Sequence, residues 1–445
     1  MKLLIFTTVL LSTFIAETKP KTDSTLIQDK VKVKNSLEAQ APLSFEHDEQ
    51  LLKLKKEALA NNPSIRAAYN NWQAEFLKVN TAGDLPDPFV SFTHYFEEVE
   101  TRTGPQKQAV NLIQKLPWFG RLDLQHSTQS KKARAAQADL QSRTLKVFKE
   151  LEQLYYDFYY LQEASRIARE NKGLLLSFEP IARNIIKTGQ SSKDLIKLQV
   201  ELGHIENRIA HLKLRYMPLK SRMNELLNLA PGTAITFTAK PHKISTLKSK
   251  KELLHAIYAN NPELKSFEFK LNSASDQILL AKKDHYPDFS VGVKYIRTSG
   301  GDTTHPDDGK DPIMLTVGMT IPLNQKRYSA LEQSAINHRE SLANSKIGKR
   351  RELERALTTT LFELQDSART YRLYTNTLIP KNSQSLKITL QSYRNGKSSF
   401  LELIDIQRQQ LDFEHMQKKA ETRIYKQYAR LRELAANENI YGEAQ

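Results

Sequence analysis

Two stretches decide how this chain of 445 residues folds: IIKTGQSSKDLIKLQ, residues 185–199, and LQSYRNGKSSFLELIDIQ, residues 390–407. Each contains a glycine, then a polar or basic residue and two serines, and each continues into a helical pattern that carries acidic residues. The glycines, Gly189 and Gly396, lie 207 positions apart. Glycine accepts the left-handed conformation with which many helices end. The chain therefore makes nearly the same turn twice, each time between helical segments.

These turns are the last of four landmarks that recur in one order. EALANNPSIRAA (57–68) is matched by HAIYANNPELKS (255–266), GDLPDPFVSFTHYF (83–96) by DHYPDFSVGVKYI (284–296), and AVNLIQKLPWFGR (109–121) by MLTVGMTIPLNQKR (314–327). Their offsets rise from 199 through 201 and 205 to 207. Four matches in order indicate a duplicated unit of about 200 residues. We assign residues 45–245 to the first repeat, 246–437 to the second and 438–445 to a short tail.

The composition narrows the classes of protein. The chain has no cysteine, which excludes disulfides, thiolate metal sites and cysteine nucleophiles. Only 15 glycines and 17 prolines favour long uninterrupted helices. The formal net charge is +16, but basic and acidic residues alternate along helical stretches such as KKARAAQADLQSRTLKVFKELEQ (131–153). This mixing favours solvated helix faces over a nucleic-acid-binding surface.

The N-terminus, MKLLIFTTVLLSTFIAETKP (1–20), has the build of a secretory signal: Lys2, an apolar run from Leu3 to Ile15, and then small and polar residues. We expect a signal peptide over 1–18 and a flexible segment over 19–44. The apolar run is shorter than the ~20 residues that a membrane-crossing helix needs, and no other long apolar run comes after it.

Alternating residues predict two strands in each repeat, at about 88–98 and 107–117 and at about 288–298 and 312–322. Runs of this length suit tilted strands that cross a membrane, although a half-buried strand of a soluble sheet has the same pattern. Four strands cannot close a barrel alone, so the membrane interpretation requires oligomerisation. The apolar residues expected on one face are Val90, Phe92 and Phe96; Val110, Leu112 and Leu116; Val291, Val293 and Tyr295; and Ile313, Leu315, Val317, Met319 and Ile321.

Heptad spacing predicts long helices that pack as coiled coils. The pattern is nearly unbroken from Gly120 to about Thr188, and such a helix would reach ~100 Å at 1.5 Å per residue. The pairs Asn62-Pro63 and Asn261-Pro262 are expected to open a helix in each repeat. In the helix after the first turn the heptad positions are Leu198, Leu202, Ile205, Ile209, Leu212, Tyr216, Leu219, Met223 and Leu226.

In these motifs the chain resembles the TolC family of Gram-negative outer-membrane efflux ducts, from about Leu51 to Ala436. ALANNP, LPDP, KLPWFGR and the two Gly-Ser turns stand where the family places its helix starts, strand boundaries and hairpin tips. The resemblance implies a mainly α fold with a membrane β-barrel part. Three copies of the four strands would form one twelve-stranded barrel in the outer membrane, and coiled-coil hairpins would form an α-barrel through the periplasm.

The resemblance also implies a function. The homotrimer would be the passive exit duct of a tripartite efflux or type I secretion system, without a cofactor. It would be embedded in outer membrane lipid and would receive its substrates from an inner-membrane RND (resistance-nodulation-division) or ABC pump through a periplasmic adaptor protein. KLPWFGR is similar to members that work with heavy-metal exporters of the RND class, but metal, drug and protein export all stay open.

The resemblance carries over to residues at both hairpin tips, about 185–195 and 392–402. Glu402 and Asp405 lie on one helical face, where a trimer would gather six carboxylates into an aperture that favours cations; a solvated helix face is the alternative. Tyr393 matches a position that helps to hold the aperture shut. Asp194 resembles the acidic gate position of the first hairpin but comes one residue early, and Ser398 stands where some members have a gating arginine. The tip residues expected to contact the adaptor are Thr188, Gly189, Gln190, Ser191 and Ser192, and Asn395, Gly396, Lys397, Ser398 and Ser399.

Other functions agree less well with these features. A periplasmic coiled-coil adaptor or structural rod would also use long helices, but adaptors carry glycine-rich, lipoyl-like β domains between theirs, and no such segment is recognisable. His204 and His211, seven positions apart, could form a metal pair, although histidines on helix surfaces are commoner. The sequence has no phosphate-binding glycine loop, zinc spacing or catalytic triad, so we do not expect an enzyme.

Overall fold

The computed structural model describes residues 49–187, 193–235, 237, 247–300 and 306–437. The expected signal peptide, the segment 19–44 and the tail 438–445 lie outside these residues. The chain divides into two units, Met1–Leu52 and Lys53–Gln445, and the second unit contains nearly all of the described residues. The elements are α3 (Glu49–Asn61, whose first residues belong to the first unit), α4 (Pro63–Val79), β1 (Phe89–Val99), β2 (Gln106–Leu116), α5 (Arg121–Lys187), α6 (Lys193–Leu227), α7 (Lys250–Asn260), α8 (Pro262–Lys283), β3 (Phe289–Thr298), β4 (Ile313–Met319), α9 (Gln325–Leu373), the π-helix η1 (Tyr374–Leu378), α10 (Ile379–Arg394) and α11 (Phe400–Ala435).

Asparagine side chains fix the starts of α4 and α8, as the Asn-Pro pairs predict. The Asn62 side chain accepts hydrogen bonds from the backbone at the start of α4, and Asn261 does the same for α8. Each amide nitrogen also donates to a distant carbonyl, Asn62 to Leu226 at 2.8 Å and Asn261 to Leu434 at 2.9 Å. The sequence did not reveal the helices α3 and α7 that precede these caps.

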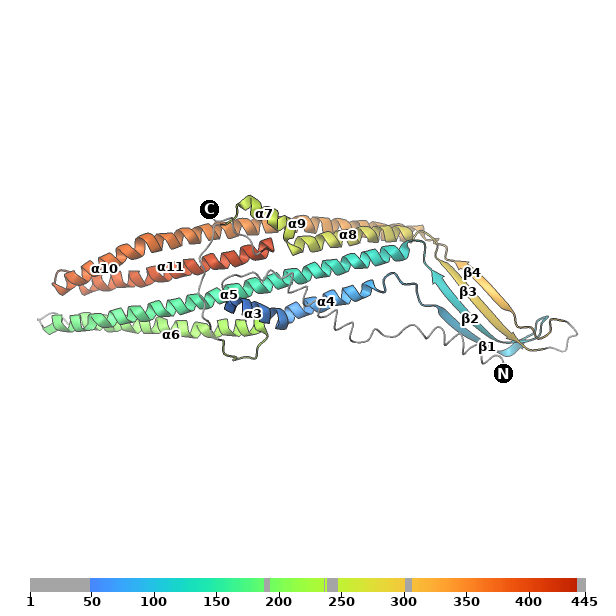
Figure 1. Cartoon of the computed structure of the whole chain (residues 1–445), viewed down its shortest axis with the longest axis horizontal. Coiled ribbons are helices and arrows are strands. Elements are labelled where there is room, and N and C mark those ends of the chain that lie inside the picture. Colours follow the sequence, from blue (N-terminus) through green and yellow to red (C-terminus); the bar gives the residue numbers. More distant parts are fainter. Residues whose placement is uncertain (1–48, 188–192, 236, 238–246, 301–305, 438–445) are drawn as a thin grey trace. The chain divides into compact units, whose positions relative to one another are not determined.

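The long helix expected from Gly120 to about Thr188 is confirmed as α5, with 67 residues. It packs against α4, α6, α8 and α11, and α11 in turn packs against α9 and α10 (Figure 1). The heptad residues of α6 lie at these contacts: Leu198, Ile205 and Leu212 are buried with side chains of α5 and α11. A second buried cluster joins α7, α8, α9 and α11 around Leu357 and Leu364.

The four strands form one antiparallel sheet in the order β1-β2-β3-β4. The β2–β3 pair joins segments far apart in the sequence, with Leu112 opposite Val293. Apolar residues align across all four strands on one face, as predicted, and most of them are exposed to solvent in the protomer. One such row is Val90–Leu112–Val293–Leu315 and the next is Phe92–Val110–Tyr295–Ile313, whereas the opposite face carries the row Ser91–Asn111–Lys294–Met314.

The fourth strand is shorter than the predicted range 312–322. It ends at Met319, and the backbone nitrogen of Thr320 still donates to the Asp288 carbonyl at 2.8 Å. The next residue of the partner segment is Pro287, which has no N–H to continue the ladder. Ile321 therefore lies beyond the strand.

A π-helix lies between α9 and α10 and interrupts the second long helix. The segment η1 runs from Tyr374 to Leu378 and ends two positions before Pro380, which lies in the first turn of α10. Proline removes one helical hydrogen bond and clashes with the carbonyl four residues earlier, and a wider turn relieves this clash. The heptad pattern records side-chain polarity and does not register this backbone effect.

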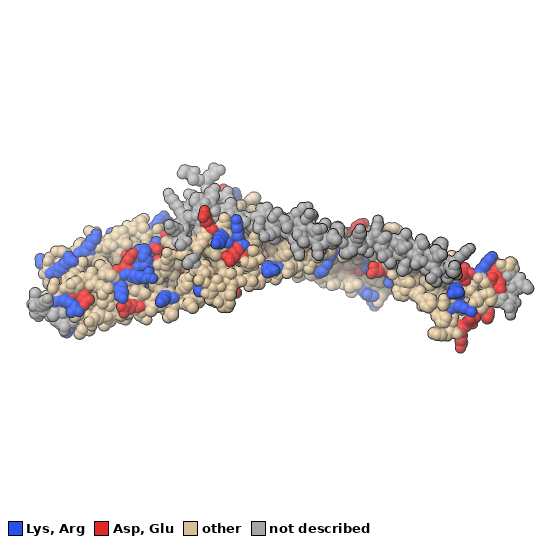
Figure 2. Space-filling view, turned by 60° about the horizontal axis from the view of Figure 1, so that its bottom comes forward, with Lys and Arg blue, Asp and Glu red and all other residues tan. Residues whose placement is uncertain are grey.

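Charged residues of both signs are interspersed along the helices on the face drawn in Figure 2. Many form pairs within one helix, as where Arg166 binds both Glu163 and Glu170. Among the residues that the structure describes, no helix is both long and apolar enough to cross a membrane.

Candidate functional site

The second hairpin turn, residues 395–399, closes α10 with a backbone arrangement that requires a left-handed residue. Gly396 has φ +70°, and its nitrogen donates to the Tyr393 carbonyl at 3.0 Å. The Lys397 nitrogen reaches back to the Ser392 carbonyl at 2.8 Å, which completes a Schellman motif. The Ser399 side chain then caps α11 by accepting from the Glu402 nitrogen at 3.2 Å. The turn is thus a fixed structure with Asn395, Gly396, Lys397 and Ser399 at its exposed surface.

Two residues that the family resemblance assigned separately to a gate are in contact. The Tyr393 hydroxyl on α10 donates to the Asp194 carboxylate on α6 at 3.1 Å, across 199 positions of sequence. Tyr393 is only 3% exposed. Burial and the adjacent carboxylate raise the pKa of Tyr393 well above its usual value of 10.0, so the hydroxyl keeps its proton and remains the donor. This hydrogen bond links the ends of the two hairpins.

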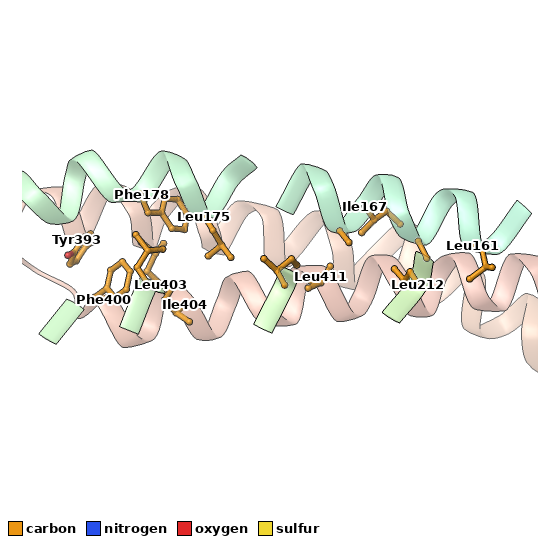
Figure 3. Packing of buried hydrophobic residues seen from close by; sticks show 14 residues of the cluster. Leu161, Ile167, Leu175, Phe178, Leu212, Tyr393, Phe400, Leu403, Ile404 and Leu411 are labelled. Atoms are coloured by element: carbon orange, nitrogen blue, oxygen red, sulfur yellow. The ribbon is translucent and has the colours of Figure 1, made fainter. Parts of the chain in front are cut away.

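Apolar side chains from four helices surround this contact. Tyr393 lies 5.4 Å from the Phe400 ring, centroid to centroid. Figure 3 shows Phe178 of α5 pointing toward Leu403 and Ile404 of α11 in the same cluster. The cluster continues along the helices toward Leu161 (Figure 3). The tyrosine is therefore held by packing as well as by its hydrogen bond.

The predicted aperture acids lie on α11, just after the turn. Glu402 and Asp405 are both exposed, one helical turn apart. Glu402 accepts a hydrogen bond from the Ser398 hydroxyl at 2.6 Å. Asp405 lies 3.5 Å from the guanidinium of Arg408. Each acid thus has a polar partner within the protomer.

The first hairpin turn, with Thr188, Gly189, Gln190, Ser191 and Ser192, lies outside the described residues. His204 and His211 are both exposed on α6. Among the described residues, no group of three or more histidine or acidic side chains is placed to hold a metal ion.

Two ion pairs between α6 and α11 were not predicted. Arg408 of α11 binds Glu201 of α6 through two guanidinium nitrogens, the Nε at 2.9 Å from Oε2. Farther from the turn, Arg208 of α6 binds Asp412 of α11 at 3.1 Å. The sequence could not single out these four residues because it contains 66 basic and 50 acidic side chains, most of them at similar helical spacings.

The sequence also did not predict which polar side chains are buried, because heptad spacing identifies only the apolar residues around them. His415 of α11 is 5% exposed, and neither ring nitrogen has a hydrogen-bond partner among the described residues. Burial and the nearby Arg208 lower the pKa of His415 to about 4, against the opposing effect of Asp412. Its ring lies 6.4 Å from that of Tyr160 on α5. His415 is therefore neutral at pH 7.

A buried charged cluster joins α3, α5 and α11 at the far end of α11. Glu152 is 3% exposed and forms ion pairs with both Lys55 and Arg432. Burial by itself would raise the pKa of Glu152, but the two cations outweigh it and hold the pKa below its usual range. The carboxylate therefore remains charged and pairs with both cations.

Two comparisons place the sequence among known proteins. Residues 253–437 match the family model of outer membrane efflux proteins. The chain is 23% identical over 255 residues to the toxin and drug export protein A of Aggregatibacter actinomycetemcomitans, with 55% of each chain aligned. It is 22% identical over 291 residues to an uncharacterised protein of Haemophilus influenzae, with 63% of each aligned. The matches thus span between half and two thirds of these relatives.

Solved structures show the same fold over most of the chain. The outer membrane channel MtrE of Neisseria gonorrhoeae, in its open state, is 16% identical with a TM-score of 0.72, over 89% of this chain and 91% of MtrE. A membrane protein of Pseudomonas aeruginosa gives 0.74 at 16% identity, over 87% and 90%. CusC gives 0.65 at 18% identity, over 89% and 93%. The C-terminal part of the chain therefore matches the outer membrane efflux protein family, and the described fold is that of the solved outer membrane channels.

Proposed function

We propose that this protein is the outer membrane exit duct of a tripartite efflux system. Three copies assemble into a passive conduit whose strands cross the outer membrane and whose helices extend into the periplasm. Substrates enter from an inner-membrane pump and a periplasmic adaptor, and no catalytic step takes place in the duct. The family match and the shared fold support this proposal.

The observation that carries the proposal is the apolar face of the sheet. Val90, Leu112, Val293 and Leu315 align in one row across four strands and are all exposed in the protomer. A soluble sheet buries such a face against other elements, whereas a transmembrane barrel turns it toward lipid. Since β1 and β4 are the outer strands, three copies could pair edge to edge and close a twelve-stranded barrel.

The helices support the periplasmic part and the internal duplication. At 67 residues, α5 reaches ~100 Å, far more than a compact domain needs. The proposed repeats, 45–245 and 246–437, each contain an asparagine cap with the same backbone conformation, φ −61° and ψ 122° at Asn62, φ −60° and ψ 121° at Asn261. Each cap also bonds to a carbonyl near the C-terminal end of a later helix in its own repeat.

The hairpin ends supply the proposed gate and docking surface. The Tyr393–Asp194 hydrogen bond supports a closed arrangement of the two hairpins in one protomer. Glu402 and Asp405 would line the aperture of the trimer. The turn 395–399, together with the first turn, would meet the adaptor. We further propose drugs or other toxic compounds as cargo, in line with the name of the relative that exports toxins and drugs.

Conductance in planar bilayers tests the duct. Detergent-purified protein is expected to form small cation-selective channels, and Glu402→Ala/Asp405→Ala is expected to weaken the selectivity because it removes the carboxylates nearest the turn. Glu340→Ala, which removes an exposed acid on α9, is the control and should leave selectivity unchanged. Recovery of the protein in the soluble periplasmic fraction instead of the outer membrane would reject the duct in favour of a coiled-coil adaptor or rod.

A further inference from the structure

Ion pairs connect α6 and α11 along the seam where the two helices lie side by side. Both helices lead away from the hairpin turns, so they run parallel at this seam. Glu201 and Arg408 face each other there, and Arg208 and Asp412 do so farther along. These four side chains, with His204 and three apolar or amide residues of α11 and α6 and one of α5, line a groove of about 290 Å³. Ion pairs bridge the two helices across this open groove.

The order of charges along α11 resists a change of register. Asp405, Arg408 and Asp412 succeed one another at spacings of three and four, so they share one helical face. Glu201, at 7% exposure, is opposite the central arginine. A slip of one helical turn, about 5.4 Å, in either direction would put Asp405 or Asp412 opposite Glu201. Either slip would bring a carboxylate of α11 next to the buried carboxylate of Glu201, and the repulsion between the two negative charges disfavours it.

Arg408 also acts on the acid nearest to it. Its guanidinium lies 3.5 Å from the carboxylate of Asp405 while it binds Glu201. Both carboxylates raise the pKa of Arg408 above its usual value, so the guanidinium stays charged. The arginine thus joins the two hairpins and offsets one of the charges assigned to the aperture.

We propose that Arg408 is the positioning residue that fixes the register of the two hairpins and tempers the cation selectivity of the aperture; the second effect rests on the duct function proposed above. This ion pair lies farther from the turn than the Tyr393–Asp194 contact, because Glu201 comes seven residues after Asp194 on α6, or roughly 10 Å along the helix. Two contacts therefore join the hairpins: the neutral hydrogen bond between Tyr393 and Asp194 near the turns, and the ion pair between Arg408 and Glu201 farther along the helices.

Distances between spin labels test the register directly, and the absence of cysteine lets labels be placed at will. Lys197→Cys on α6 and Gln409→Cys on α11 are both exposed positions. Labelled chains diluted with unlabelled chains are expected to give one narrow distance. Arg408→Gln should broaden it or add a second distance, because Glu201 loses its only guanidinium partner among the described residues. Arg408→Lys should largely restore the single distance.

The control is Arg423→Gln, which removes an exposed arginine of α11 that has no ion pair among the described residues. It should change neither the label distance nor the channel. In bilayers, Arg408→Gln should shift the reversal potential toward stronger cation selectivity, since Asp405 is no longer offset. An unchanged label distance in Arg408→Gln, with circular dichroism like that of the parent, would overturn the positioning role. If the parent protein forms no channels, the duct fails but the label distances still decide the register.

Discussion

Acidification should weaken the folded state through His415. The folded pKa of about 4 lies below the ordinary value of 6.5, so between these values the unfolded chain binds a proton that the folded chain excludes. This stability is fully present above pH 6.5 and is lost as the pH falls toward 4. A difference of that size corresponds to about 3 kcal/mol per protomer. The physical causes are the burial of the ring and the nearby positive charge of Arg208, and the ring has no hydrogen-bond partner among the described residues.

His415→Leu isolates this contribution. The substitution removes two buried nitrogen atoms without partners among the described residues, so it should be neutral at pH 7 or stabilising by up to about 2 kcal/mol. Guanidinium unfolding monitored by helical circular dichroism, from pH 8 to pH 4, gives the free energy of unfolding of parent and variant. The difference in the free energy of unfolding between parent and variant should grow by about 3 kcal/mol over this range, because only the parent carries His415.

His338→Leu is the matched control, since His338 is exposed on α9. It should reproduce the pH dependence of the parent. Effects of carboxylates cancel in the comparison because both chains carry the same ones. A parent-minus-variant difference that stays constant from pH 7 to pH 4 would show that His415 protonates without cost, and the reasoning from its burial would be wrong.

Three further substitutions test single contacts by chemical or thermal unfolding. Tyr393→Phe keeps the ring but removes the donor to Asp194, and it should lower the free energy of unfolding by about 1.5–3 kcal/mol; an unchanged midpoint would mean that water replaces the bond fully. Asn62→Ala and Asn261→Ala each remove a helix cap and a buried bond to a distant carbonyl, and each should cost about 1–3 kcal/mol. Glu152→Ala removes the buried carboxylate that pairs with both Lys55 and Arg432 and should cost about 3–5 kcal/mol, whereas a loss below about 1 kcal/mol would contradict the burial of that cluster.

The elements that repeat a local pattern were predictable from the sequence. Heptad spacing located α5 within a residue at each end, and alternation put Val90, Leu112, Val293 and Leu315 on one face of the sheet. These predictions succeed because side-chain periodicity is tied directly to helix and strand geometry. The turn at Gly396 was predictable for a different local reason: its backbone requires a positive φ, which glycine adopts without strain.

Features that depend on tertiary contacts were not predictable. Family resemblance pointed to Tyr393 and Asp194 one by one, but no local pattern joins residues 199 positions apart. Arg408 and Glu201 look like any other charged helix residues until α6 and α11 are laid side by side. The π-helix before Pro380 depends on how the backbone relieves a clash, which polarity does not encode.

The open sheet leaves the edges of β1 and β4 available for pairing with other strands. β1 and β4 pair on one side only within the described protomer, so each presents a free row of backbone donors and acceptors next to an apolar surface. Such edges pair readily with any strand they meet. If three copies close a barrel as proposed above, a copy that has not yet assembled exposes both edges. In that case assembly would be the last step of folding, and unassembled copies would aggregate instead of persisting as free protomers.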